Sequence, residues 1–185
     1  DYERGRVFIQ GVYQAIQDRL ATGNKNPVRL LYAGTGPFGW LVLPLLSIFT
    51  AEQLQVTAID IHEQSLGKFR KICEFYGVDN RIAEWVCADA CRWKPTSVDL
   101  FDIILSETMK YVLQQEPQVQ IFSWLQQYLA PAGVLIPESV TLGVTLLWRS
   151  KQPREVFLGE AFKLDRHTAR EIATGDSRCL SRCFS

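Results

Sequence analysis

The sequence has few of the residues that metal sites and disulfide frameworks need. It contains only two histidines, His62 and His167, and its five cysteines are odd in number, with no secretory pattern beside them. An odd count argues against a disulfide framework. The histidines and cysteines also do not match the usual spacings of zinc ligands. We therefore expect reduced thiols, no metal site and a cytoplasmic protein.

Long apolar runs and an excess of one charge are missing as well. The longest apolar segment, residues 38–49, is interrupted by Gly39, Pro44 and Ser47, and it is shorter than the ~20 residues of a membrane span. Twenty basic and twenty acidic residues give a formal net charge of zero. No overall field therefore attracts nucleic acid or an anionic membrane, and we expect neither as a partner.

What is present is a pattern of apolar strands that alternate with amphipathic helices. Strands are expected at residues 28–32, 55–60, 82–87, 101–105 and 134–136, and helices at 5–21, 38–48, 64–76 and 119–129. This alternation predicts an α/β fold, a Rossmann-like doubly wound and mostly parallel sheet with helices on both faces. A further strand at 140–148 and a short helix at 165–173, capped by Asp165, are expected after it.

The carboxyl ends of the expected strands carry glycines and acids. The first strand runs through Ala33 into Gly34, Thr35, Gly36 and Pro37, and the later ones end at Asp60, near Asp89 and at Ser106–Glu107. Ligands of doubly wound sheets bind at this edge. Pro37 has the backbone geometry of a first helical residue. Asp60 and Asp89 have a second interpretation, as caps of the helix or loop that follows each of them.

Five short segments lie in or directly after the expected strands. They are G-T-G-P at 34–37, A-I-D at 58–60, D-A-C-R-W at 89–93, D-I-I-L-S-E at 102–107 and G-V-L-I-P-E at 133–138. Together they resemble the class I S-adenosylmethionine-dependent methyltransferases over residues 28–145. More narrowly, the chain resembles the catalytic core of the protein arginine methyltransferases, because Glu116 follows Glu107 at the spacing of that family's two loop glutamates. The Gly-x-Gly-Pro loop is similar to that of the symmetric-dimethylating branch.

The resemblance implies S-adenosylmethionine as the cofactor, bound by a domain at residues 28–150. Residues 1–27 would be a helix packed on that domain, and residues 151–185 a C-terminal extension. The implied cofactor-binding residues are Ala33, Gly34, Thr35, Gly36, Pro37, Asp60, Ile61, Asp89, Ala90 and Ser106. Among them, Gly34 and Gly36 would line the methionine end and Asp60 the ribose, with Asp89 and Ala90 at the adenine.

Glu107 and Glu116 are the implied catalytic pair, holding a guanidinium or amine nitrogen of the methyl acceptor. The acceptor class stays open between a protein arginine and a small molecule, and a homo-oligomer is allowed. In a small-molecule methyltransferase only Glu107 would act, and Glu116 would be an acid at a helix N-terminus. A non-catalytic cofactor-binding module is a further alternative.

A dinucleotide-dependent oxidoreductase is the last alternative, because Gly34, Gly36 and Gly39 fit G-x-G-x-x-G. The chain also departs from the arginine methyltransferases. Tyr32 replaces a glycine of their loop, no Thr-His-Trp element occurs, and the residues after Leu147 are too few for their β-barrel. We therefore expect residues 140–148 to pair near the fifth strand.

Overall fold

A computed structural model describes residues 2–23, 26–96, 99–109, 117–148 and 154–175 of the chain. The helices are α1 (Tyr2–Ala21), α2 (Leu43–Ile48), α3 (Glu63–Phe75), α4 (Gln118–Leu125) and α5 (Arg166–Thr174), with short 3-10 turns at Asp79–Arg81 and Gln126–Tyr128. The strands are β1 (Val28–Ala33), β2 (Leu54–Asp60), β3 (Ile82–Cys87), β4 (Phe101–Ser106), β5 (Leu129–Ile136), β6 (Ser139–Trp148) and β7 (Arg154–Asp165). No helix in these ranges is long and apolar enough to cross a membrane.

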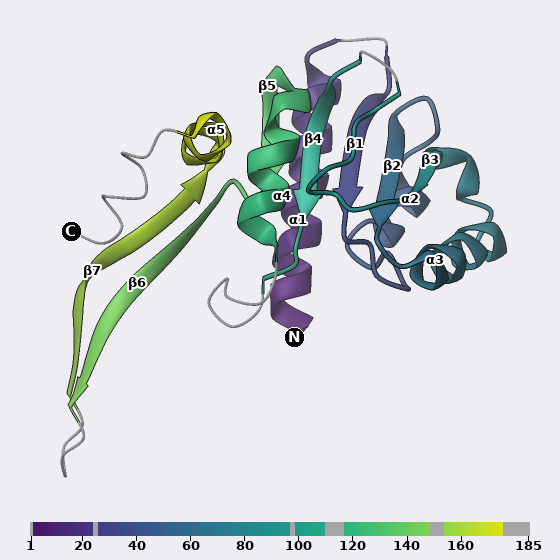
Figure 1. Cartoon of the computed structure of the whole chain (residues 1–185). Coiled ribbons are helices and arrows are strands. Elements are labelled where there is room, and N and C mark those ends of the chain that lie inside the picture. Colours follow the sequence, from purple (N-terminus) through teal and green to yellow (C-terminus); the bar gives the residue numbers. More distant parts are fainter. Residues whose placement is uncertain (1, 24–25, 97–98, 110–116, 149–153, 176–185) are drawn as a thin grey trace.

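The first five strands form one parallel sheet in the order β3-β2-β1-β4-β5 (Figure 1). The chain moves outward from β1 to β3 and then returns to β4 on the other side of β1. The strand order therefore reverses between β1 and β4, the place where sheets of this class bind ligands. The predicted α/β class and parallel arrangement are confirmed.

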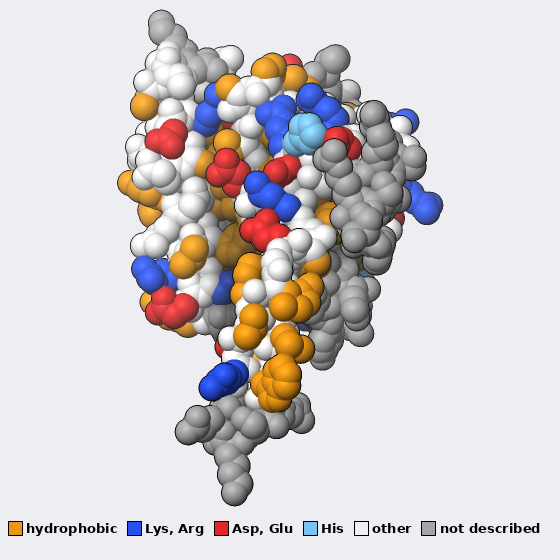
Figure 2. All heavy atoms as spheres, turned by 90° about the vertical axis from the view of Figure 1, so that its left-hand side faces the viewer, with side chains coloured by type: hydrophobic (Ala, Val, Ile, Leu, Met, Phe, Trp, Pro, Cys, Tyr) orange, Lys and Arg blue, Asp and Glu red, His pale blue; other side chains and the backbone are white. Residues whose placement is uncertain are grey.

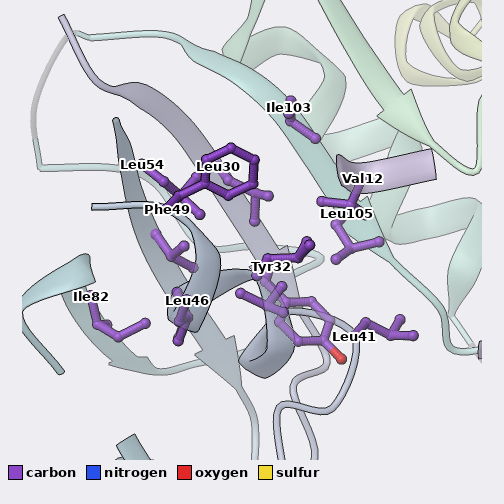
Figure 3. Close-up of a cluster of buried hydrophobic side chains, with 14 of the residues drawn as sticks. Val12, Leu30, Tyr32, Leu41, Leu46, Phe49, Leu54, Ile82, Ile103 and Leu105 are labelled. Carbon is purple, nitrogen blue, oxygen red and sulfur yellow. The ribbon is translucent and has the colours of Figure 1, made fainter. Parts of the chain in front are cut away.

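Helices cover both faces of this sheet, as predicted. Alternate residues of β1 point to opposite sides: Leu30 and Tyr32 enter a cluster with α1, α2 and α3, whereas Leu31 enters a cluster with α4 and α5. Figure 3 shows Leu30 and Tyr32 surrounded by side chains of the first cluster, Val12 of α1 among them. A parallel strand that is buried on both faces is rich in apolar residues, which explains the apolar run at residues 30–33 within β1.

Two helix boundaries differ from the expectation. Helix α2 begins at Leu43 with Pro44 in its first turn, so Pro37 is not the first helical residue. The preceding loop turns instead through Gly39, which has a φ of 52° and faces the Phe69 ring of α3. Helix α4 ends at Leu125, earlier than predicted, and β5 begins four residues later.

The chain after β5 forms an antiparallel hairpin of β6 and β7, separate from the main sheet (Figure 1). The expectation that residues 140–148 pair near the fifth strand is therefore wrong. A strand was predicted at these residues, but its partner is β7, which the sequence did not indicate as a strand. The predicted domain boundary after residue 150 falls inside this hairpin.

Helix α5 follows the hairpin and packs against α4, where its Ala169 is buried. The predicted cap is confirmed: Asp165 accepts a hydrogen bond from the Thr168 backbone N–H at 3.0 Å. This bond holds the pKa of Asp165 below its ordinary value. Arg166 donates hydrogen bonds to backbone carbonyls at the start of β5, including those of Ala130 and Gly133. These contacts anchor the base of the hairpin to the sheet.

Candidate functional site

A cavity of about 500 Å³ opens at the carboxyl ends of β1, β2, β3 and β4. Its walls combine glycines, apolar side chains and three acids. The lining residues are Gly34, Gly36, Ile59, Asp60, Ile61, His62, Ala88, Asp89, Ala90, Glu107, Thr108, Met109, Pro117 and Ile121. The strand ends meet here because the sheet is parallel, and the cavity lies at the reversal of strand order.

The loop after β1 uses two glycines with left-handed backbone. Gly34 has a φ of 79° and Gly36 a φ of 61°, conformations that L side chains rarely adopt. A Cβ atom on Gly34 would lie 2.8 Å from the Thr108 side chain, whereas one on Gly36 would meet nothing within 4 Å. The first glycine therefore lets two loops approach each other, and the second leaves open space at the cavity.

Asp60 connects the loops that follow β1 and β2. Its Oδ2 accepts a hydrogen bond from the Gly36 N–H at 2.8 Å, and its Oδ1 accepts one from the His62 N–H at 2.9 Å. The residue is 7% exposed and lies two positions before the N-cap of α3, which is His62. Asp60 is thus not the cap of α3. A carboxylate has about four acceptor positions, so it retains acceptors for a ligand.

Asp89 both lines the cavity and stabilises its own turn. Its Oδ1 accepts a hydrogen bond from the Cys91 N–H at 2.9 Å. The interpretation of this acid as a loop cap is therefore confirmed, and its contact with a ligand stays a prediction. Burial, and then the Asp89 carboxylate, raise the pKa of the Cys91 thiol to about 11, so this cysteine stays neutral at physiological pH.

Glu107, at the end of β4, pairs with Arg4 from the distant N-terminal helix. The Glu107 side chain is 18% exposed and that of Arg4 38% exposed, so the pair is partly shielded from water. Burial and the Glu107 charge raise the pKa of Tyr32 above its ordinary value, and this phenol stays protonated. The second predicted glutamate, Glu116, lies outside the described residues.

Gln118 organises the loop after β4, and sequence reasoning missed it. The residue is fully buried. Its Oε1 accepts hydrogen bonds from the backbone N–H and hydroxyl of Thr108, both at 3.0 Å, and its Nε2 donates to the Ser106 carbonyl at 3.1 Å. A glutamine in the first turn of a helix is usually exposed. No pattern in the sequence therefore distinguished it.

The structure brings most of the predicted site residues to the cavity wall. Seven line it: Gly34, Gly36, Asp60, Ile61, Asp89, Ala90 and Glu107. Four others, Ala33, Thr35, Pro37 and Ser106, do not. The Ser106 hydroxyl is buried and has no hydrogen-bond partner within the described ranges. No group of three or more His, Cys, Asp or Glu side chains that could hold a metal ion occurs in those ranges.

No family model matches the sequence, and no curated protein matches it. Several solved structures, however, are similar to this chain. Protein arginine methyltransferase 10 of Arabidopsis thaliana aligns over 62% of this chain at 20% identity with a TM-score of 0.52. A candidate sarcosine dimethylglycine methyltransferase of Galdieria sulphuraria aligns over 74% at 16% identity with a TM-score of 0.50. The [4+2]-cyclase SpnF also matches, over 64% of this chain at 23% identity with a TM-score of 0.49.

The alignments span less than half of each of these proteins: 31% of the plant chain, 48% of the algal chain and 40% of the cyclase. At sequence identities this low, the structural similarity is evidence for the fold only. Together with the strand order β3-β2-β1-β4-β5, the likenesses to the plant and algal proteins show that this chain has a Rossmann-like α/β fold, the fold of those two structures.

Proposed function

We propose that the chain binds S-adenosylmethionine in the cavity and is a methyltransferase. The observation that carries this proposal is the cavity itself, which joins a glycine loop at β1 to carboxylates at β2 and β3. Its volume of about 500 Å³ lies within the usual range of small-molecule sites. The names of the plant and algal proteins with this fold, both methyltransferases, support the same proposal.

The residues at the wall fit the parts of this cofactor. Gly34 and Gly36 leave room for its methionine end, since neither carries a side chain. Asp60 would accept hydrogen bonds from the ribose hydroxyls with its remaining lone pairs, and Asp89 would accept one from the adenine amine. The bound cofactor would supply an electrophilic methyl group next to Glu107.

The start of α2 argues against the dinucleotide alternative. A pyrophosphate is bound where a helix N-terminus directly follows the glycine loop. Here α2 begins only at Leu43, well after Gly36, and it has six residues. Its first turn also offers no free N–H group to a pyrophosphate, because Leu43 and Leu45 donate to carbonyls of the preceding loop and Pro44 has no N–H.

Titration calorimetry tests the choice of cofactor. We expect S-adenosylhomocysteine to bind one site per chain with a dissociation constant of roughly 1–100 μM, about 5.5–8.2 kcal/mol of binding free energy. NAD⁺ should release no measurable heat at the same concentrations. Binding of NAD⁺ without binding of S-adenosylhomocysteine would overturn the proposal in favour of the oxidoreductase.

For the acceptor, we propose a guanidinium or amine nitrogen held by Glu107, with Glu116 as the second acid. The supporting contact is internal: Glu107 already pairs with the guanidinium of Arg4. Planar guanidinium groups suit carboxylates because they offer two parallel donors. A substrate cation would take the place of Arg4, and its charge would stay neutralised during methyl transfer.

Replacing Arg4 tests this acceptor class. In the presence of saturating S-adenosylhomocysteine, Arg4→Met should bind an arginine-containing peptide about fivefold or more tightly than the unchanged chain, because the internal competitor is gone. The matched control is Arg6→Met, since Arg6 lies on the same helix and pairs with Glu3 at the exposed surface. Fluorescence anisotropy of a labelled peptide measures both.

Equal peptide affinities for the two variants would contradict the cation site. Glu107 would then serve to hold α1 against the sheet. That result would favour a small-molecule methyltransferase or a non-catalytic cofactor-binding module. Calorimetry with S-adenosylhomocysteine alone separates it from a failure of the cofactor proposal.

A further inference from the structure

A groove of about 630 Å³ lies between α1 and the outer strand β5, and it shares no lining residue with the cavity at the strand ends. Most of its wall is apolar. Val7, Phe8 and Ala15 line it from α1, and Val134 and Ile136 line it from β5. Val7 is 59% exposed, so part of this apolar wall is open to solvent. The proposed methyl transfer makes no use of this groove.

Beside the groove, β5 is an edge strand. In the described part of the chain it pairs with β4 alone, and it is the last strand in the order of the sheet. The next strand, β6, turns away and pairs with β7. Figure 2 shows this hairpin projecting from the domain, with hydrophobic side chains along it. Edge strands present N–H and C=O groups that can pair with another extended chain.

Only the first half of this edge is blocked. Arg166 donates hydrogen bonds to four carbonyls there, the last of them that of Gly133. Residues 134–136 have no hydrogen-bond partner outside β4 among the described residues. Leu135 lines the groove although its side chain is 2% exposed and packs on the opposite face of the sheet. It therefore offers its main chain to the groove.

The charges at the groove favour a basic occupant. Three charged residues line it: Asp18, Arg19 and Glu138. Arg19 is paired with Asp102, which balances its charge. Asp18 accepts a hydrogen bond from the neutral amide of Gln14, and neither Asp18 nor Glu138 forms an ion pair within the described ranges. Two carboxylates at the groove therefore have no cation beside them.

We infer that the groove binds an extended, basic segment of a partner protein, which joins the sheet as a strand beside β5. Strand addition takes its affinity from main-chain hydrogen bonds and its specificity from pockets for alternate side chains. Apolar residues at every second position of the segment enter the groove, and lysine or arginine near its ends meets Asp18 and Glu138. An acidic segment would instead bring like charges together. This inference is independent of the proposed function.

A synthetic peptide tests the charge of the occupant. The probe has blocked ends, a fluorescent label and the sequence Lys-Val-Thr-Val-Thr-Val-Lys. Its fluorescence anisotropy should rise as the protein is added. Replacing both lysines by glutamate should weaken binding by about tenfold or more, because the charges at the groove then repel the peptide.

Methylated probes test strand addition. One carries N-methyl groups on its valine amides and the other on its threonine amides, with the side chains unchanged. Every second amide of an added strand points toward β5, so at least one of these probes should bind about tenfold more weakly. If neither loses affinity, binding needs no hydrogen bonds to β5 and the inference is overturned.

Gly11→Leu tests the location of the site. Gly11 lines the groove, and a Cβ atom there would meet nothing within 4 Å. A leucine side chain can therefore occupy the groove without a clash in α1, and the probe should bind about tenfold more weakly. Gly67→Leu is the matched control, because Gly67 lies within α3, away from the groove, and a Cβ atom there also meets nothing. Leucine favours a helix more than glycine does, so both variants should stay folded.

Circular dichroism checks the fold of each variant. If Gly11→Leu unfolds, the double variant Asp18→Asn, Glu138→Gln repeats the test, with Glu74→Gln on the exposed side of α3 as its control. The inference is overturned if the probe does not bind at the highest soluble protein concentration. It is equally overturned if Gly11→Leu and Gly67→Leu bind the probe with the same affinity, because the peptide would then use another surface.

Discussion

Gly39→Ala should lower the free energy of unfolding by about 2–4 kcal/mol. Gly39 has a φ of 52°, which costs an L residue ~1 kcal/mol. A Cβ atom there would also lie 2.1 Å from Cε2 of Phe69. Phe69 is fully buried and its ring packs edge-on against Trp85 at 5.2 Å. The ring therefore has little room to move, and overpacking of this kind adds ~1–3 kcal/mol.

Gly77→Ala provides the control for backbone strain alone. Gly77 follows α3 with a φ of 64°, and a Cβ atom there would meet nothing within 4 Å. Chemical denaturation should show a loss of only ~1 kcal/mol for this variant. Equal losses for Gly39→Ala and Gly77→Ala would show that the Phe69 contact relaxes easily and that the loop before α2 is not held by packing.

Asp60→Ala should weaken the binding of S-adenosylhomocysteine by about 1.5–3 kcal/mol, or roughly 10- to 150-fold. The carboxylate lies at the cavity wall and accepts backbone hydrogen bonds from Gly36 and His62. Its removal deletes an acceptor for the ligand and also releases the two loops that shape the site. Titration calorimetry measures the affinity.

Glu63→Ala is the matched control, because this acid lies three residues beyond Asp60 on the exposed first turn of α3. It removes the same charge and should leave the affinity unchanged. A thermal melt of each variant separates lost binding from lost folding. Unchanged affinity in a folded Asp60→Ala protein would show that this carboxylate serves only the architecture of the loops.

Much of the site was predictable from local patterns. Asp60, Asp89 and Glu107 each follow an apolar strand, and parallel strands bring their carboxyl ends to one edge of a sheet. Recognition of the strands therefore placed these acids together without further information. Ser106 and Thr35 were predicted as cofactor-binding residues because they adjoin such strand ends, but both side chains are buried and neither lines the cavity. Whether a residue at a strand end faces the cavity depends on the side of the strand to which it points and on how deeply the strand end is covered.

Contacts between distant segments were not predictable in this way. Arg4 and Glu107 are 103 positions apart, and nothing in the sequence near either residue indicates the other. Gln118 looked like a surface residue, yet it is buried against the end of β4. Trp40 and Trp148 lie in apolar segments of the sequence, yet their side chains are 45% and 65% exposed. Such contacts depend on which helix crosses which strand.

The sequence by itself determined the class of the fold and the location of the cavity. Apolar periodicity specifies each strand and helix through local sterics and burial, and alternation of the two leaves few topologies to choose from. Only the tertiary structure decided how β6 is paired, where α2 begins and which cation faces Glu107. Each of these features depends on competition between alternative long-range contacts. The energy of such a contact is set by two segments together, so the sequence of either segment alone does not predict it.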